Sequence, residues 1–253
     1  MMKPIINSLF TSFSLYSRIP VPQTEWKEEN RRYVLSFFPL VGAVIGVLQY
    51  LNFRYSGFVV SAYLTSLIAV LIPVAVTGGI HLDGFCDVCD AKASFAPKEK
   101  KIEIMHDPHI GSFAVISLCL YFISQLVLFE NADNTAWYLI IVGYVLSRAL
   151  SGVAVFTFSC ISTGMLETVN NRRKTNLVIC IIWALICSAL MIYIYPLRGA
   201  MTVGAALLSF AYYYFMSRKH FGGINGDLAG WFLQVCEICI CAAAVISGGT
   251  LWG

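Results

Sequence analysis

The sequence predicts an all-α protein: a polytopic integral membrane helical bundle of about seven transmembrane helices, preceded by an N-terminal interfacial helix. Three observations predict this class. Of the 253 residues, 58% are hydrophobic, against about 45–50% in soluble domains. Only 12% are charged, about half the usual share. The apolar residues also gather into stretches of about 17–25 residues, the length that spans a bilayer.

The apolar stretches predict the elements in chain order. Pro4–Ile19 is apolar but includes Ser12, Ser14 and Arg18, so we expect a helix that lies on or dips into the membrane surface. No small-residue cleavage site follows, which disfavours a signal peptide. Without a linker or fixed-period repeat, residues 1–253 are expected to form a single integral membrane domain. The seven expected spans are Tyr33–Asn52, Val59–Thr77, Ser112–Phe129, Trp137–Thr157, Leu177–Tyr195, Met201–Met216 and Gly230–Gly249.

The basic residues predict which side of the membrane each loop faces. If the N-terminus is cytoplasmic, most of the 17 lysines and arginines fall in cytoplasmic loops, and the outer loops keep only Arg54 and Arg198. The positive-inside rule therefore predicts a cytoplasmic N-terminus. The acidic turn Glu130–Asp133 would face outward, and every motif-rich loop would face the cytoplasm. The lipid bilayer is an expected partner, and nucleic acid is not.

The segment Gly78–Asp90 carries the strongest motif. Asp83, Asp87 and Asp90 are spaced i, i+4, i+7, so on a helix their carboxylates share one face. Three like charges at a membrane edge repel one another and lose solvation, and a divalent cation would relieve both penalties. Oxygen ligands favour Mg²⁺ or Mn²⁺ shared with a substrate phosphate. The alternative is a solvated acidic helix start; we favour the metal interpretation because acids are rare beside apolar spans.

The same segment contains Cys86, Cys89 and His81, each with more than one interpretation. The C-x-x-C spacing is compatible with a zinc or redox site, but no second Cys or His pair follows at the usual distance. Both cysteines lean toward the aspartate-free side of the helix, so packing is favoured. His81 is open between a metal ligand, a phosphate contact, a general acid or base and a helix cap.

Two further clusters lie in loops expected on the same side. In Met105–Ser112, Asp107 stands in a turn before a span, where its carboxylate can join the metal site. Nearby lysines either attract a polyanion or serve only as orientation signals and lipid contacts. In Gly222–Asp227, glycines at a helix start can cradle phosphate and Asp227 can ligate metal. Flexible loops also use glycine, so this motif alone is weak.

Two charged residues fall inside expected spans. Glu237 is a functional candidate because an acid in an apolar span is costly. Arg148 lies in the inner half of its span, within reach of a phosphate. It has two alternatives, snorkelling to the interface and pairing with Glu237.

Taken together, the acids, glycine turns and cations suit phosphoryl or nucleotidyl transfer with a metal clamp at the cytoplasmic membrane face. P-loop, nucleophile-elbow and Rossmann motifs are missing from the sequence, so covalent serine chemistry and dinucleotide redox chemistry lack support. An ion-coupled membrane transporter is the main alternative. Carriers, however, place their charged residues near the midplane of repeated halves, a pattern that this sequence does not show.

The chain resembles the cobalamin synthase family, the adenosylcobinamide-GDP ribazoletransferases, along nearly its whole length. A looser likeness to the CDP-alcohol phosphotransferases rests on the spaced aspartates, but the Ala-Arg step after their first Asp-Gly is missing. The blocks that carry the main resemblance are Ser17–Pro22, Phe37–Gly42, Gly78–Asp90, Ile104–Gly111, Leu146–Leu150 and Gly222–Asp227, followed by Glu237.

The resemblance implies a reaction in which α-ribazole, or its 5′-phosphate, attacks adenosylcobinamide-GDP and releases GMP, with Mg²⁺ as cofactor. It also implies the bacterial cytoplasmic (inner) membrane as location. A homo-oligomer and association with other cobalamin-assembly enzymes are both open. The implied metal ligands are Asp83, Asp87, Asp90, Asp107 and Asp227, one aspartate of the first three also acting as base. The catalytic candidates are Asp83, Asp87, Asp90 and His81, and the substrate-binding candidates are Arg148, Gly223, Gly226 and His109.

Some positions depart from the family pattern. Cys86 and Cys89 stand where small residues are usual, and Ala91 stands where Gly is common. His109 occupies a position often held by Arg, so a permanent positive charge is not expected there. None of these departures removes a carboxylate.

Overall fold

The computed structural model describes residues 2–56, 60–161 and 173–249. Within these ranges the chain is almost entirely helical, and the only strand-like feature is an isolated parallel bridge between Cys160 and Ile224. The all-α prediction is confirmed. The helices are α1 (Met2–Tyr16), α2 (Glu28–Arg31), α3 (Val34–Tyr55), α4 (Ala62–Thr77), α5 (Ile80–Ala93), α6 (Lys98–Met105), α7 (Ser112–Glu130), α8 (Asn134–Thr157), α10 (Arg173–Ile194), α11 (Pro196–His220) and α12 (Gly226–Ile246).

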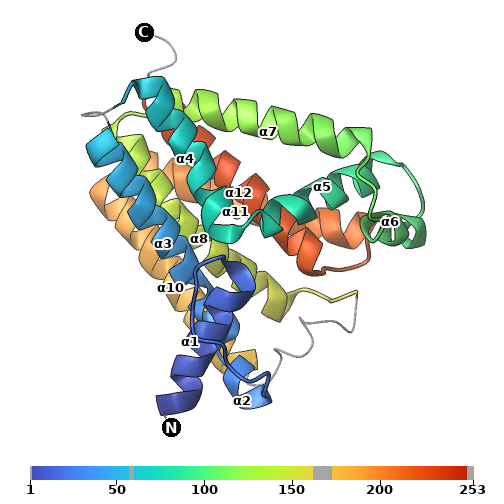
Figure 1. The fold of residues 1–253 in the computed structure, drawn as a ribbon. Coiled ribbons are helices and arrows are strands. Elements are labelled where there is room, and N and C mark those ends of the chain that lie inside the picture. The colour runs from blue at the N-terminus through green and yellow to red at the C-terminus, as the bar shows by residue number, and fades with distance from the viewer. Residues whose placement is uncertain (1, 57–59, 162–172, 250–253) are drawn as a thin grey trace.

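Helix α8 is at the centre of the bundle. It packs against α3, α10 and α12, and 78% of its most apolar stretch is buried inside the protein. Helices α7 and α10 lie at the periphery (Figure 1), with only 22% and 17% of their apolar stretches buried. Apolar surface that faces outward in this way suits contact with the hydrocarbon core of a bilayer, which contains no water.

The number of spans agrees with the prediction. Within the described ranges, six helices are long and apolar enough to cross a membrane: α3, α7, α8, α10, α11 and α12. The expected second span corresponds to α4, whose 16 residues meet this criterion only together with α5, and α5 is bent from it by 96°. The expected first residue of that span, Val59, lies outside the described residues. With the bent pair counted as one span there are seven, so the polytopic bundle is confirmed.

The bend between α4 and α5 is produced by two glycines. Gly78 and Gly79 have φ of +66° and +80°, a left-handed conformation that ends α4. The Arg18 side chain lies across Gly78, where an added Cβ would come within 2.5 Å of it. The Arg18 backbone N–H also donates to the Val76 carbonyl at 2.7 Å. The segment that follows α1 therefore holds the bend in place.

Helix α1 differs from a purely amphipathic surface helix. It packs against α2 and α3 (Figure 1), and Ser8, Thr11 and Ser12 are buried there. The Thr11 hydroxyl donates to the Asn7 carbonyl at 2.8 Å and lies 2.8 Å from the Thr24 hydroxyl. These polar side chains thus face protein, where Thr11 finds hydrogen bonds, whereas the buried Ser12 hydroxyl has no partner among the described residues. The position of α1 at the membrane surface stays a prediction.

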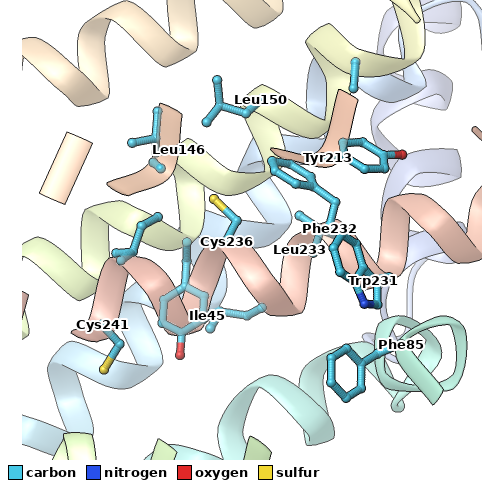
Figure 2. Close-up of a cluster of buried hydrophobic side chains, with 14 of the residues drawn as sticks. Ile45, Phe85, Leu146, Leu150, Tyr213, Trp231, Phe232, Leu233, Cys236 and Cys241 are labelled. Carbon is cyan, nitrogen blue, oxygen red and sulfur yellow. The ribbon is translucent and has the colours of Figure 1, made fainter. Parts of the chain in front are cut away.

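Helix α12 carries a row of buried side chains between α5, α8 and α11 (Figure 2). The Phe232 ring stacks on Tyr213 of α11 with centroids 4.7 Å apart. Trp231, one residue earlier in α12, points toward Phe85 of α5 (Figure 2). In lipid, such close packing stabilises helix contacts more than water exclusion does. It fixes α12 against its neighbours and so sets the position of its first turn.

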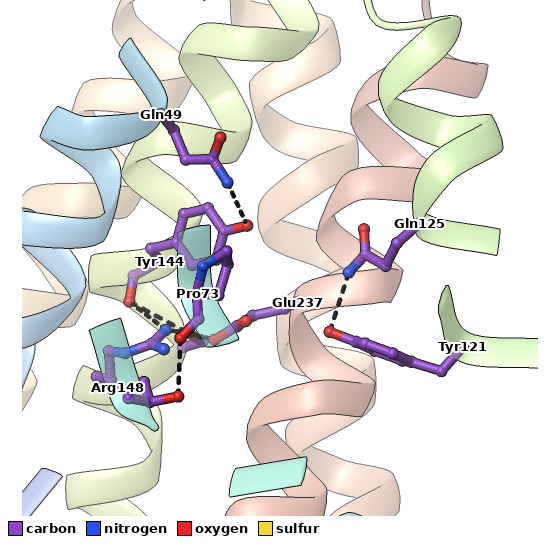
Figure 3. A network of polar contacts seen from close by, with 9 residues as sticks. Gln49, Pro73, Tyr121, Gln125, Tyr144, Arg148 and Glu237 are labelled. Carbon is purple, nitrogen blue, oxygen red and sulfur yellow. Dashed lines mark hydrogen bonds and ion pairs between the residues drawn. The ribbon is translucent and has the colours of Figure 1, made fainter. Parts of the chain in front are cut away.

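A buried polar network connects α3, α8 and α12 (Figure 3). Arg148 of α8 is 1% exposed and forms an ion pair with Glu237 of α12. Its Nη1 group also donates to the Tyr144 carbonyl and the Ser147 hydroxyl, each at 3.0 Å. Gln49 of α3 donates to the Tyr144 hydroxyl at 3.3 Å. Of the alternatives for Arg148, pairing with Glu237 is the one that the structure shows.

This network predicts a large loss of stability for Arg148→Ala, because the Glu237 carboxylate would stay buried without its counter-charge. We expect a loss of about 3–5 kcal/mol in the free energy of unfolding. The matched control is Lys100→Ala, which removes an exposed pair with Glu103 and should change stability little. Thermal and denaturant unfolding in detergent would measure both.

The double variant Arg148→Met with Glu237→Leu should recover most of the lost stability, since it leaves no buried charge unpaired. Equal stability of Arg148→Ala and Lys100→Ala would contradict the assigned role of the pair.

Candidate active site

Two glycines bring α5 and α12 into backbone contact. An added Cβ on Gly84 of α5 would come within 2.7 Å of the Asp227 Cα atom. One on Gly230 of α12 would come within 3.1 Å of the His81 carbonyl oxygen. A side chain at Gly84 would therefore force the two helices apart. The contact places the first turn of α12, with Asp227, beside the acidic turns of α5.

Asp83, Asp87 and Asp227 form a group of acids at this contact, called here the acid cluster. Partial burial, together with the carboxylates of Asp83, Asp227 and Asp90, raises the pKa of Asp87 to about 6. His106, at the end of α6, has the opposite effect and so lies close to the cluster. A carboxylate whose pKa is raised by burial and by neighbouring acids is held in place at a cost in stability, which is typical of functional sites.

Asp90, the third member of the predicted triad, is bonded to the start of α7. Its Oδ2 accepts from the Gly111 N–H at 2.6 Å and its Oδ1 from the Ala114 N–H at 2.8 Å. An added Cβ on Gly111 would come within 2.6 Å of this carboxylate, so only glycine allows the approach. Asp90 thus satisfies helix-end amides that otherwise lack a partner. Of the triad, Asp83 and Asp87 keep their carboxylates free of bonds to the described residues.

Asp107 and His109 are not brought into the acid cluster. The Asp107 Oδ1 atom accepts from the His109 backbone N–H at 2.9 Å and lies 2.7 Å from its Nδ1. These hydrogen bonds lower the pKa of Asp107. Both side chains are exposed, His109 to 90%. The predicted roles of Asp107 as metal ligand and His109 as substrate contact stay predictions. His106, which sequence reasoning missed, is the member of this motif beside the cluster; its only signal was its place next to Asp107.

A cavity of 240 Å³ borders the acid cluster, between α1, α3, α5, α8 and α12. Asp83, Asp227 and His81 line it, together with apolar and aromatic side chains. His81 is 6% exposed, and its ring lies 6.5 Å from that of Tyr16 and 5.7 Å from that of Phe38. Its Nε2 atom has no hydrogen-bond partner in the described part of the chain. Helix capping, one of the roles left open for His81, is therefore not made through the Nε2 atom.

The two predicted phosphate-binding glycines have different surroundings. Gly226 begins α12 and lines the cavity, and an added Cβ there would meet nothing within 4 Å. Gly223 instead packs on the Ser159 carbonyl oxygen, where the chain after α8 runs beside it. Asn225 caps α12, accepting from the Leu228 N–H at 2.9 Å. Gly226 is thus at the open helix start that suits an anion, whereas Gly223 is at a packing contact.

Arg148 contributes no surface to this cavity, because its guanidinium is closed off by Glu237 and Tyr144. The residue proposed to reach a phosphate is therefore occupied inside the bundle. Its predicted role in substrate binding would require the network of Figure 3 to open.

The acid cluster fits a metal ion that is shared with substrate. No group of three or more His, Cys, Asp or Glu side chains converges tightly enough to hold a metal within the described ranges. Mg²⁺, however, keeps several waters and is usually held by one or two carboxylates plus substrate phosphates. The two unbonded carboxylates on α5, Asp83 and Asp87, are available for such a shared site, and Asp227 lies beside them.

The C-x-x-C pair is part of the packing around α5. Cys86 is buried, and Cys89 is half-buried beside Ser117 and Trp231. None of the nine cysteines forms a disulfide within the described residues. This surrounding agrees with the packing interpretation.

The backbone contact predicts that Gly84→Ala will damage the site. The added methyl group displaces α5 from Asp227, so we expect a fall in catalytic activity with a lower unfolding temperature. The control is Gly204→Ala in α11, where an added Cβ meets nothing within 4 Å. That change should leave activity intact and raise stability slightly, by up to about 1 kcal/mol. Similar behaviour of the two variants would contradict the contact.

The bonding of Asp90 predicts that Asp90→Asn and Asp83→Asn will differ in stability. An asparagine amide would turn one donor toward an α7 N–H, which we expect to cost about 1–3 kcal/mol. Asp83→Asn removes a like charge from an exposed carboxylate and should not lower stability. Thermal unfolding in the same detergent would measure the difference, and equal losses would show that Asp90 is not the anchor of α7.

Comparison with known proteins agrees with the resemblance inferred from the motifs. A family model described as cobalamin-5-phosphate synthase matches residues 8–245. A protein of Lachnoclostridium phytofermentans named adenosylcobinamide-GDP ribazoletransferase is 38% identical, over 97% of this chain and 96% of its own. A protein of the same name from Clostridium botulinum strain Alaska E43 is 30% identical over 94% of this chain and 96% of its own.

A third relative of that name, from Clostridium kluyveri, is also 30% identical, over 94% of this chain and 95% of its own. No solved structure matches the chain. A match that covers nearly the whole sequence, with relatives that align from end to end, establishes kinship over the entire bundle. The chain belongs to the cobalamin-5-phosphate synthase family.

Proposed function

We propose that the chain is an adenosylcobinamide-GDP ribazoletransferase. A ribose hydroxyl of α-ribazole, or of its 5′-phosphate, attacks the cobinamide-side phosphorus of adenosylcobinamide-GDP. The new phosphorus–oxygen bond replaces the bond to GMP, and the hydroxyl proton passes to a carboxylate. The products are GMP and adenosylcobalamin, or its 5′-phosphate. The family description and the names of the relatives support this reaction.

The observation that carries the mechanism is the acid cluster at the mouth of a cavity. Asp83 and Asp87 lie close to Asp227, although Asp227 is far from both in the sequence. Asp83 and Asp227 both line the cavity. Attack of a hydroxyl on one phosphorus of a diphosphate needs a base to take the proton and a way to offset negative charge. Mg²⁺, when bound with substrate, supplies the second by neutralising charge on the transferred phosphate. The cluster orients the acceptor hydroxyl, and Gly226 at the start of α12 offers backbone N–H groups.

The active site is proposed to face the cytoplasm. Lys98 and Lys101 of α6 contact the end of α11, where Lys98 donates to the Arg218 carbonyl and Lys101 lies 3.2 Å from His220. These basic residues come from loops that the positive-inside rule assigns to the cytoplasm. They also make that end of the protein attractive to a polyanionic donor.

The opposite end supports the same orientation. Arg198 binds Asp133 there through two hydrogen bonds of 2.7 and 2.9 Å. Both residues come from segments assigned to the outer side. The transporter alternative is not favoured, because the charged residues inside the bundle, Arg148 and Glu237, pair with each other.

The reaction is tested by GMP release from adenosylcobinamide-GDP plus α-ribazole, using purified protein in nanodiscs with Mg²⁺ or with chelator. We expect chelator to abolish release and Asp87→Asn to lower kcat at least about 100-fold. Glu103→Gln, an exposed acid paired with Lys100, is the matched control and should keep wild-type activity.

Metal binding is tested separately by electron paramagnetic resonance of Mn²⁺. Weak binding is expected for the protein alone, and tighter binding with adenosylcobinamide-GDP, because the phosphates complete the ligand set. Asp87→Asn should lose this donor-dependent binding. GMP release that persists in chelator would leave the family assignment standing and overturn the metal mechanism.

A further inference from the structure

The 240 Å³ cavity beside the acid cluster has features that the reaction scheme alone does not explain. Most of its wall is apolar or aromatic, formed by Leu15, Tyr16, Leu35, Phe38, Val155 and Leu233. It therefore differs from a phosphate site, which would need cations or several N–H donors. An apolar pocket with a few placed polar groups is typical of a site for a small organic ligand.

One buried polar atom among the residues that line the cavity has no hydrogen-bond partner within the described residues. The His81 Nε2 atom is buried and unbonded, and its ring lies beside the Tyr16 and Phe38 rings, which contact each other with centroids 4.3 Å apart. A buried polar atom without a hydrogen bond is costly and rare, so such an atom in a cavity wall indicates a ligand that completes it.

The size of the cavity selects among the parts of the two substrates. A dry apolar cavity of about 150 Å³ holds one benzene ring. At 240 Å³ this cavity has room for a planar two-ring base but not for a corrin ring. The candidates are therefore the guanine of the donor and the base of α-ribazole, a dimethylbenzimidazole.

The polarity of the walls distinguishes these two bases. Guanine has several donors and acceptors along its edge, and most would be left unpaired against leucine, valine and phenylalanine walls, which is unfavourable. A dimethylbenzimidazole bears one free ring nitrogen and two methyl groups. Its methyl groups suit the apolar wall, and its ring nitrogen can accept one hydrogen bond.

We propose that this cavity is the acceptor's base pocket, in which His81 donates a hydrogen bond to the free ring nitrogen of the α-ribazole base, and the base lies against the wall that Tyr16 and Phe38 form. The proposal rests on the proposed function. His81 is then an acceptor-binding residue and takes no part in proton transfer. Because Asp83, Gly226 and Asp227 line the same cavity, the ribose attached to the base emerges at the acid cluster. The pocket thus orients the attacking hydroxyl toward the phosphate.

The first test measures binding without turnover. α-Ribazole alone is titrated into nanodisc-embedded protein, with no donor and no Mg²⁺, and followed by the fluorescence of its base. His81→Leu keeps the volume of the side chain and removes the donor, so we expect affinity to fall about 3- to 10-fold. Asp87→Asn should bind α-ribazole as wild type does, although it has lost turnover. Unchanged binding in His81→Leu would overturn the assignment of His81.

The second test narrows the cavity. Val155→Phe should raise the KM for α-ribazole at least about tenfold, because the larger ring overfills the site. The riboside of unsubstituted benzimidazole should be affected less, and the KM for adenosylcobinamide-GDP should not change. The control is Leu207→Phe on the outward face of α11, where the side chain is exposed. If Val155→Phe does not fold, Ser151→Val narrows the same cavity more gently and should act in the same direction.

The outcomes separate this proposal from the proposed function. A raised KM for adenosylcobinamide-GDP alone would assign the cavity to guanine and overturn the base pocket, while the reaction itself stands. Equal effects on α-ribazole and the unsubstituted riboside would also count against it. If wild-type protein binds α-ribazole and His81→Leu weakens it, but no GMP is released under any condition, the pocket stands and the proposed reaction fails.

Discussion

The backbone contact between α5 and α12 at Gly84 and Gly230 is the constraint on which the rest of the site depends. It allows Asp227 to stand beside the acidic face of α5, and it makes both helices walls of the same cavity. The contact requires a sharp bend between α4 and α5, and Gly78 and Gly79, both in the left-handed conformation, permit it. Side chains at Gly84 and Gly230 would push α5 and α12 apart and move Asp227 away from Asp83 and Asp87.

The contact is held from within the bundle. Apolar packing fixes α12 against α11 and α8, and the Arg148–Glu237 pair joins α12 to α8. Such a pair is costly to break in an apolar surrounding, because either partner alone would be an unpaired charge. The same pair withdraws Arg148 from the cavity. Arg148, which the sequence predicted to reach a phosphate, instead joins α8 to α12.

In the proposed reaction, catalysis and acceptor binding would use two different kinds of surface. The acid cluster is polar, partly solvated and strained by its like charges, as suits metal and phosphate. The adjoining cavity is apolar, with a single buried histidine whose Nε2 atom has no partner among the described residues. A substrate that carries a flat apolar base on a sugar spans both surfaces, so the two features together orient one reactive hydroxyl.

The sequence by itself determined the membrane bundle and its spans, because hydropathy is a local property of the chain, and its motifs predicted Asp83, Asp87 and Asp227 as site residues. Only the tertiary structure decided which charges meet. In the folded chain, Asp90 binds the start of α7, and Asp107 is bonded to the exposed His109. His106 lies near the acid cluster, and Arg148 pairs with Glu237. The fold also encloses His81 against Tyr16 and Phe38. These contacts join residues far apart in sequence, and they follow from a helix bend and two glycine contacts whose directions no local pattern specifies.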